Sequence, residues 1–349
     1  MAAVNVRMNP FGVIGAIFVM ICLWWYLFGL PLSSREEQRV SMKELLTVSI
    51  ELAKRGGDSV YAIRTGGSLG QKVKGKTAEG AKEMLTQGDM ESHRAIMYGM
   101  LKAFPGLRVI SEEHETAPIS LERVKDVTRK LAEVERLIQS DQQIPVSDIA
   151  VWIDPLDATQ EYTENLTQYV TTMVCVAIKG EPTIGVIHRP FEKETVWAWA
   201  GYGHSENLKK SKEKKIDEND QTKIIVSRSH KGEVEEVAKK AFGEKTIVVP
   251  AGGAGYKTLA LVKGEVDAYV HVTLIKKWDI CAGNAILSAL DSRMTDLKGN
   301  TIDYSASGNA KNEHGLLATL YNHDTYVRKL EGIMDNTKKK EKRSDSMNR

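Results

Sequence analysis

The stretch IDPLDATQEYT, residues 153–163, contains the densest group of side chains that could perform chemistry. An apolar run delivers Asp154, and Pro155 makes the following turn rigid, so that Asp157 can aim at the same point. Two such carboxylates repel one another, and a hard divalent cation would offset the repulsion. The N–H groups of a short helix starting near Thr159 would suit a phosphate. The structural alternative is a turn residue at Asp154 and a helix N-cap at Asp157.

Three further acidic positions accompany this turn. The pair Glu112-Glu113 follows the run Leu107-Arg108-Val109-Ile110, Asp279 begins an apolar helix, and Asp89 precedes another helical stretch. Each also has a purely structural interpretation, as a solvated loop pair for the glutamates and as an N-cap for each aspartate. Oxygen-only ligands at this density favour Mg²⁺ over zinc or copper.

The composition limits the function classes. The 349 residues suffice for one large domain or two fused lobes, and 48 Lys and Arg against 46 Asp and Glu leave a net charge of +2. This balance does not suggest binding to a nucleic-acid polymer. The three cysteines, Cys22, Cys175 and Cys281, form no disulfide framework, and we expect Cys175 and Cys281 to be buried free thiols.

Residues 11–32 contain no charged side chain and predict a membrane-spanning anchor, since about 20 apolar residues span a bilayer. The alternative, a cleaved signal peptide, is disfavoured because the run ends in aromatic residues typical of a membrane interface, such as Trp24 and Trp25. Positive charges are sparse before the run and more numerous after it, which by itself would place the globular part in the cytosol.

The remaining pattern predicts a layered α/β fold with two lobes around a cleft. A helix is expected over 45–53, ending near Gly56-Gly57, and another is expected after Asp89, up to residue 104. Strands are expected at 149–153, 170–178, 184–188, 196–200, 224–226, 247–249, 268–272 and 316–319. Helices are expected at 233–241, 256–262 and 280–290.

Together the acidic motifs resemble the inositol monophosphatase superfamily of lithium-sensitive, magnesium-dependent phosphatases. Its signatures, a Glu-Glu pair after a strand, a DP(I/L)D(G/A)T turn and a WD motif heading a helix, occur here in the family's order. The stretches VSRSH, PAGGAGYK and KKWDICAGNAIL are similar to its bisphosphate nucleotidase branch, and above all to the branch's membrane-anchored Golgi member. The resemblance implies a stacked α/β/α/β/α sandwich of the sugar phosphatase type, preceded by one transmembrane helix.

The resemblance also implies roles for particular residues. Asp89 and Thr159 fall on the family's acid–base positions. The positions that match its ligands for two or three Mg²⁺ ions are Glu112, Asp154, the Leu156 carbonyl, Asp157 and Asp279. The positions that match substrate contacts are Ser227, His230, Gly253 and Lys257. Asn165 lies in a glycosylation sequon, which matters only if the domain is lumenal.

The expected domain plan is a tail at 1–10, an anchor at 11–32, a linker at 33–40, a catalytic domain at 41–335 and a charged tail at 336–349. The two lobes of the catalytic domain are expected at about 41–200 and 201–335. The resemblance places the protein in the Golgi membrane, with the N-terminus cytosolic and the catalytic domain lumenal. No obligate protein partner is evident.

The resemblance implies the activity of a 3′(2′),5′-bisphosphate nucleotidase, which removes the 3′-phosphate of adenosine 3′,5′-bisphosphate to give AMP. In the Golgi lumen this would support sulfation. One alternative is an inositol phosphate phosphatase, and another is a catalytically silent membrane scaffold. The set of mutually repulsive acids argues against the scaffold, which would have no use for them.

Overall fold

The computed structural model describes residues 9–28, 37–76, 82–115, 119–213, 221–228 and 231–331. The chain forms two units, Met1–Gln38 and Arg39–Arg349. Most of the expected N-terminal tail and linker, His230 and the expected charged tail lie outside the described residues. The division of the catalytic domain into lobes near residue 200 stays a prediction.

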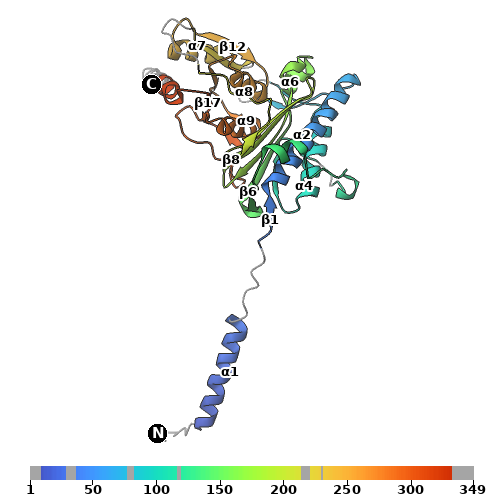
Figure 1. The fold of residues 1–349 in the computed structure, drawn as a ribbon, viewed down its shortest axis with the longest axis vertical. Coiled ribbons are helices and arrows are strands. Elements are labelled where there is room, and N and C mark those ends of the chain that lie inside the picture. Colours follow the sequence, from blue (N-terminus) through green and yellow to red (C-terminus); the bar gives the residue numbers. More distant parts are fainter. Residues whose placement is uncertain are drawn as a thin grey trace, which may run out of the picture. The chain divides into compact units, whose positions relative to one another are not determined.

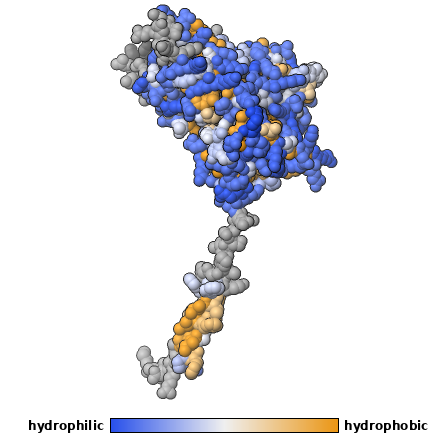
Figure 2. Space-filling model, in the orientation of Figure 1, coloured by the Kyte–Doolittle hydropathy of each residue, from blue (hydrophilic) through white to orange (hydrophobic). Residues whose placement is uncertain are grey.

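The first unit contains helix α1 (Pro10–Phe28). Its apolar side chains are exposed, and Figure 2 shows them as a hydrophobic segment. Among the residues that the structure describes, no helix is both long and apolar enough to cross a membrane.

A six-stranded sheet forms one half of the second unit, in the order β10-β9-β8-β7-β6-β4. Its strands are β4 (Arg108–Ser111), β6 (Ile149–Asp157), β7 (Thr171–Ile178), β8 (Glu181–Arg189), β9 (Glu194–Trp199) and β10 (Gly203–His204). β4 is parallel to β6, and the other neighbours are antiparallel. The tight turn between β7 and β8 has positive φ at Lys179 and at Gly180, as the twist of a two-residue hairpin requires.

A five-stranded sheet forms the other half, in the order β12-β11-β13-β17-β15. Its strands are β11 (Lys223–Ser227), β12 (Ile247–Ala251), β13 (Ala268–His271), β15 (Arg293–Thr295) and β17 (Leu316–Thr319). β11 is parallel to β12 and β13, and β17 is antiparallel to β13 and β15. Three two-stranded ribbons complete the strands of the described chain: β1 (Arg39–Ser41) with β5 (Gln143–Pro145), β2 (Lys72–Lys76) with β3 (Lys82–Leu85), and β14 (Ile275–Lys276) with β16 (Lys311–Asn312).

The helices form layers on both sheets (Figure 1). They are α2 (Met42–Thr65), α3 (Gln87–His93), η1 (Arg94–Tyr98), α4 (Gly99–Ala103), η2 (Leu121–Arg123), α5 (Ala132–Leu137), η3 (Val146–Asp148), α6 (Thr159–Thr163), η4 (Thr167–Tyr169), α7 (Lys231–Phe242), α8 (Ala254–Val262), α9 (Lys277–Ala289) and a terminal helix at 323–331. One core lies between α2, α4 and the six-stranded sheet, and a second surrounds α8 and α9 between the two sheets. A third core joins the five-stranded sheet to α7 and the terminal helix. The expected layered α/β architecture is confirmed.

Helix α2 continues past Gly56 and Gly57, where the sequence predicted its end. The glycines serve close packing instead. A Cβ at Gly56 would lie 2.5 Å from the Ser92 hydroxyl oxygen, and a Cβ at Gly57 would collide with the His188 ring. Glycine therefore lets this helix approach α3 and β8 closely, which local propensity does not reveal.

The strand carrying the first acidic motif is also longer than predicted. β6 runs to Asp157 instead of ending at Ile153, with an irregularity in its pairing to β7 between Asp154 and Asp157. Pro155 is tolerated there because a bulge removes the need for a ladder hydrogen bond.

The expectation of free thiols at Cys175 and Cys281 is wrong. Both side chains are buried, as expected, but they form a disulfide that joins β7 to α9. The two positions are separated by 106 residues in the sequence, so only the packing of α9 on the sheet reveals that they meet.

Candidate active site

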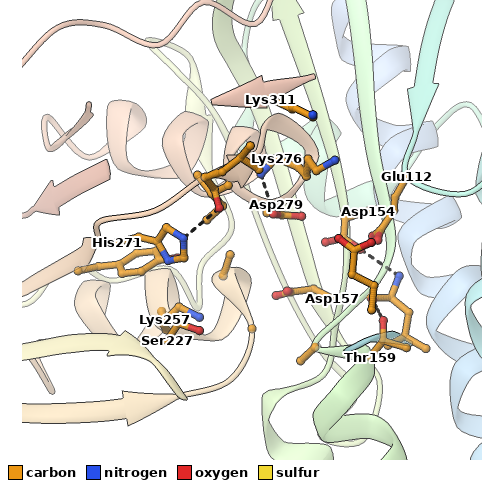
Figure 3. Close-up of a pocket in the computed structure, with 18 of the residues that line it drawn as sticks. Glu112, Asp154, Asp157, Thr159, Ser227, Lys257, His271, Lys276, Asp279 and Lys311 are labelled. Atoms are coloured by element: carbon orange, nitrogen blue, oxygen red, sulfur yellow. Dashed lines mark hydrogen bonds between the residues drawn. The ribbon is translucent and has the colours of Figure 1, made fainter. Parts of the chain in front are cut away.

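Three carboxylates from three different elements converge at one edge of the six-stranded sheet (Figure 3). Glu112 follows β4, and its backbone N–H donates to the Ile153 carbonyl of the parallel strand β6. Asp154 lies in β6, and Asp279 lies in the first turn of α9. One oxygen of each carboxylate lies within 4.8 Å of the others.

Burial and mutual repulsion disfavour the ionised form of these carboxylates. Burial raises the pKa of Asp154 well above its ordinary value, and Glu112, Asp157 and Asp279 raise it further. Burial and the Glu112 charge likewise raise the pKa of Asp279. Because the donors are all oxygens and mutually repulsive, the residues fit a hard divalent cation such as Mg²⁺.

Lys74 of β2 supplies a positive charge next to the cluster. Its Nζ lies 2.7 Å from Glu112 Oε1 and also pairs with Glu113. Although burial acts in the opposite direction, the two glutamates raise the pKa of Lys74 above its ordinary value. The β2–β3 ribbon is therefore held to Glu112 by an ion pair.

Asp157 lies in the same cavity but has different partners. Its Oδ2 accepts hydrogen bonds from the Gly255 N–H at 2.8 Å and from the Thr171 hydroxyl at 3.1 Å. Asp157 thus binds the start of α8, instead of capping the short helix α6 as the structural alternative suggested. Burial raises the pKa of Asp157, and the charge of Lys257 offsets part of that effect.

Asp89 and Thr159 are brought into direct contact. The Thr159 hydroxyl lies 3.0 Å from Asp89 Oδ1 and 3.1 Å from the Leu156 carbonyl oxygen. Asp89 lies inside α3 and not before it, because Thr86 is the N-cap. Burial raises the pKa of Asp89 to about 7, against the opposing effect of the Thr86 hydrogen bond.

A cavity of about 490 Å³ opens beside these groups, which is within the range of small-molecule sites. Ser227, Gly253 and Lys257 also line it. Figure 3 shows Ser227 and Lys257 across the cavity from Glu112 and Asp154. Gly253 has φ of 64°, and a Cβ there would lie 2.6 Å from the Tyr169 carbonyl oxygen, so this position requires glycine. Lys257 is buried, and its Nζ lies 5.3 Å from the centre of the Tyr269 ring.

One predicted position, Asn165, lies apart from this cavity, and another, His230, lies outside the described chain. Asn165 is exposed at a positive φ of 63°, with its side-chain oxygen accepting a hydrogen bond from Arg64 Nε at 3.1 Å. His230 lies outside the described residues, so its contact with the cavity stays a prediction.

Sequence reasoning missed several residues around the site. The spacing of Thr86 and Asp89 is that of a capping box, a signal that could have identified Thr86. Lys74, Lys276 and Lys311 come from ribbons too short for any periodic signal. Tyr269 lines the cavity with a buried hydroxyl that has no hydrogen-bond partner in the described part of the chain.

Comparison with known proteins identifies the class. A profile of the inositol monophosphatase family matches residues 41–334. The relative named inositol monophosphatase 3 of Danio rerio is 45% identical over 96% of this chain and 99% of its own. The Golgi-resident adenosine 3′,5′-bisphosphate 3′-phosphatase of Homo sapiens is 42% identical over 95% of this chain and 98% of its own.

Solved structures agree on the fold. The extragenic suppressor protein suhB of Bartonella henselae aligns with a TM-score of 0.61 at 17% identity, over 82% of this chain and 98% of its own. The inositol monophosphatase of Anabaena aligns with a TM-score of 0.58 at 19% identity, over 83% of this chain and 96% of its own. The chain belongs to the inositol monophosphatase family. It is a phosphatase, and its acidic cluster matches the metal dependence of that family.

Proposed function

We propose that the protein hydrolyses the 3′-phosphate of adenosine 3′,5′-bisphosphate, giving AMP and inorganic phosphate. The observation that carries the proposal is the convergence of Glu112, Asp154 and Asp279 beside the Asp89–Thr159 pair, in a cavity also lined by Ser227 and Lys257. The curated relatives named for this activity, at 42–44% identity over nearly the whole chain, support the choice of substrate.

We assign the binding of two or three Mg²⁺ ions to Glu112, Asp154, Asp157, Asp279 and the Leu156 carbonyl. When bound, such ions neutralise the phosphate dianion, activate water and stabilise the leaving oxygen. Asp157 would have to release or share its hydrogen bonds to α8 to take part.

The protein's own groups move the proton. With its hydroxyl directed at Asp89 Oδ1, Thr159 can accept a hydrogen bond from the attacking water and orient it. As the water oxygen attacks phosphorus, the bond between phosphorus and the 3′ oxygen breaks. One proton of the water passes through Thr159 to Asp89, and the leaving 3′ oxygen takes up a proton from solvent to become the hydroxyl of AMP. Burial suits this role, because it keeps the pKa of Asp89 near 7. Cys175 and Cys281 are joined in a disulfide, so neither is available as a nucleophile.

The substrate end of the cavity is assigned to Ser227, His230, Gly253 and Lys257. Gly253 lets the backbone approach a ligand closely, and Lys257 contributes a positive charge. Phosphate release from adenosine 3′,5′-bisphosphate and from inositol 1-phosphate, measured side by side with the purified protein and Mg²⁺, tests the proposal. Faster turnover of inositol 1-phosphate would favour the alternative, an inositol phosphate phosphatase, which the 45% identity to inositol monophosphatase 3 supports.

We further assign the protein to the Golgi membrane, anchored by residues 11–32, with the catalytic domain in the lumen. The uncharged N-terminal run and the names of the Golgi relatives support this location. So does the Cys175–Cys281 disulfide, because disulfides persist in oxidising compartments. Protease protection of the catalytic domain in sealed microsomes, together with a mass shift at the exposed Asn165, would be expected. Digestion without detergent would rule out the lumenal location.

A further inference from the structure

Two lysines face one another across the small β14–β16 ribbon at the edge of the catalytic cavity. Lys276 and Lys311 are direct partners in its antiparallel register. Both line the cavity that contains Glu112, Asp154 and Asp279 (Figure 3). Like charges placed directly opposite one another destabilise a strand pair, so this arrangement calls for a compensating anion.

The protein supplies only part of that negative charge, from Asp279, whose carboxylate interacts electrostatically with Lys276 without forming a direct ion pair. Within the described chain, neither ammonium group lies within ion-pair distance of a carboxylate, and the recorded contact of Lys276 Nζ is with the Trp278 ring, 5.4 Å from its centre. The cavity has other lysines with different surroundings. Lys74 next to it is paired with Glu112 and Glu113, Lys257 is buried near Asp157 and Glu161, and Lys76 also lines the cavity.

The ribbon adjoins the carboxylates, since the backbone N–H of Lys276 donates to Asp279 Oδ2 at 3.0 Å. The phosphate that is hydrolysed must lie at the carboxylates, next to Asp89 and Thr159. Figure 3 shows Lys276 and Lys311 on one side of those carboxylates, with Ser227 and Lys257 on another. A substrate with a single phosphate, held at the carboxylates, would bring no second anionic group to the ribbon lysines.

We propose that Lys276 and Lys311 bind a second phosphate group of the substrate and thereby select a bisphosphate over a monophosphate. This rests on the proposed phosphatase activity toward a small bisphosphate, and it assigns the selectivity to two residues outside the substrate-contact positions named above. Two ammonium groups match the charge of a phosphate dianion, and each charge-assisted hydrogen bond contributes appreciably to binding.

The test compares adenosine 3′,5′-bisphosphate with adenosine 3′-monophosphate, using the full-length protein with Mg²⁺. The variants are Lys276→Met, Lys311→Met and the double variant, because methionine keeps the apolar stem and removes the charge. We expect kcat/KM for the bisphosphate to fall about tenfold in each single variant and about 100-fold in the double variant, mainly through KM. Hydrolysis of the monophosphate should change less than about threefold, since it lacks the group that the lysines bind.

Matched controls separate charge from folding. Lys276→Arg and Lys311→Arg should keep most of the preference, and Lys298→Met, at an exposed position outside the cavity, should keep all of it. An unchanged preference in the double variant would overturn the inference. So would an equal loss with both substrates when the melting temperature is unchanged.

Failure of the substrate proposal is distinguishable from failure of this inference. If the wild-type protein hydrolyses inositol phosphates but neither nucleotide, the substrate proposal is wrong. The inference is then tested by measuring kcat/KM of the same variants for inositol 1-phosphate and inositol 1,4-bisphosphate. If the double variant loses a preference for the inositol bisphosphate, the role of the ribbon lysines in binding a second phosphate is supported. If the wild type shows no such preference, that role is refuted.

Discussion

The hydroxyl of Thr86 donates a hydrogen bond of 2.5 Å to Oδ2 of Asp89, while Oδ1 of the same carboxylate accepts from Thr159 at 3.0 Å. Thr86 also donates its backbone N–H to Oδ2 at 2.7 Å. Asp89 is therefore fixed on one side by the start of α3 and presents its other oxygen to Thr159. These bonds favour the ionised carboxylate, against the burial that raises its pKa to about 7.

Replacing Thr86 with valine should slow turnover without abolishing folding. The variant loses the side-chain bond to Asp89 and the cap of α3, which costs about 1 kcal/mol of stability. We expect kcat to fall about tenfold, as is typical when a general base loses its orientation. The acidic limb of the kcat–pH profile should move to higher pH, because the pKa of Asp89 rises when a bond to its ionised form is lost.

Thr86→Ser keeps the hydroxyl and is the matched control. It should restore both the rate and the position of the acidic limb. A Thr86→Val profile that superimposes on that of the wild type would show that Thr86 only caps the helix.

Asp154→Asn should remove most of the activity while leaving the fold intact. The buried Asp154 is surrounded by Glu112, Asp157 and Asp279, so a neutral amide relieves repulsion in the metal-free protein. We expect kcat to fall at least about 100-fold and the increase of melting temperature on adding Mg²⁺ to shrink. Asp324→Asn, at an exposed position far along the chain, is the control. A near wild-type rate for Asp154→Asn would refute the metal assignment.

Loss of the disulfide should destabilise the protein. Cys175 and Cys281 connect β7 to α9, and their bond closes a loop of about 100 residues in the unfolded chain. The Cys175→Ala/Cys281→Ala variant should lose about 2–5 kcal/mol of unfolding free energy, measured by urea denaturation. Cys22→Ser, which removes a free thiol, should be neutral. Equal stability of the double variant and the wild type would show that the cysteines are reduced in the native protein.

Stability should decline in mild acid, in part through His323. Burial lowers the pKa of His323 from 6.5 to about 4, so the unfolded state binds a proton in that window while the folded state does not. The unfolding free energy contributed by this residue is therefore complete above pH 6.5 and is lost as the pH falls toward 4. Between pH 7.5 and pH 5, the wild type should lose about 1–2 kcal/mol more than His323→Gln. His314→Gln, at an exposed position, should follow the wild type.

Much of the fold follows from local sequence pattern. Apolar runs such as 316–319 and 170–178 predicted strands that the structure places within a residue or two. The errors arose where tertiary contacts override local preference. The pairing of β6 with β7 extends a strand through Pro155, and close helix packing keeps Gly56 inside α2.

The candidate site was predictable where motifs are contiguous or belong to a family pattern. The convergence of Glu112, Asp154 and Asp279 follows from the parallel ends of β4 and β6 and the packing of α9. Lys276 and Lys311 could not be predicted to meet, because 35 residues separate them and a ribbon of two residue pairs leaves no pattern in the sequence.

The two glycines inside α2 bear on attempts to engineer a more robust form of the protein. Replacing a mid-helix glycine with alanine is a standard stabilising change, worth about 1 kcal/mol. Here the added methyl group would strike the buried His188 ring from Gly57, or the Ser92 hydroxyl and Ile96 from Gly56. The helix-propensity gain would be outweighed by overpacking, which costs about 1–3 kcal/mol. Mutational tolerance along this helix should therefore be lowest at the two residues that a propensity scale would replace first, and a deep mutational scan would show both positions depleted of alanine.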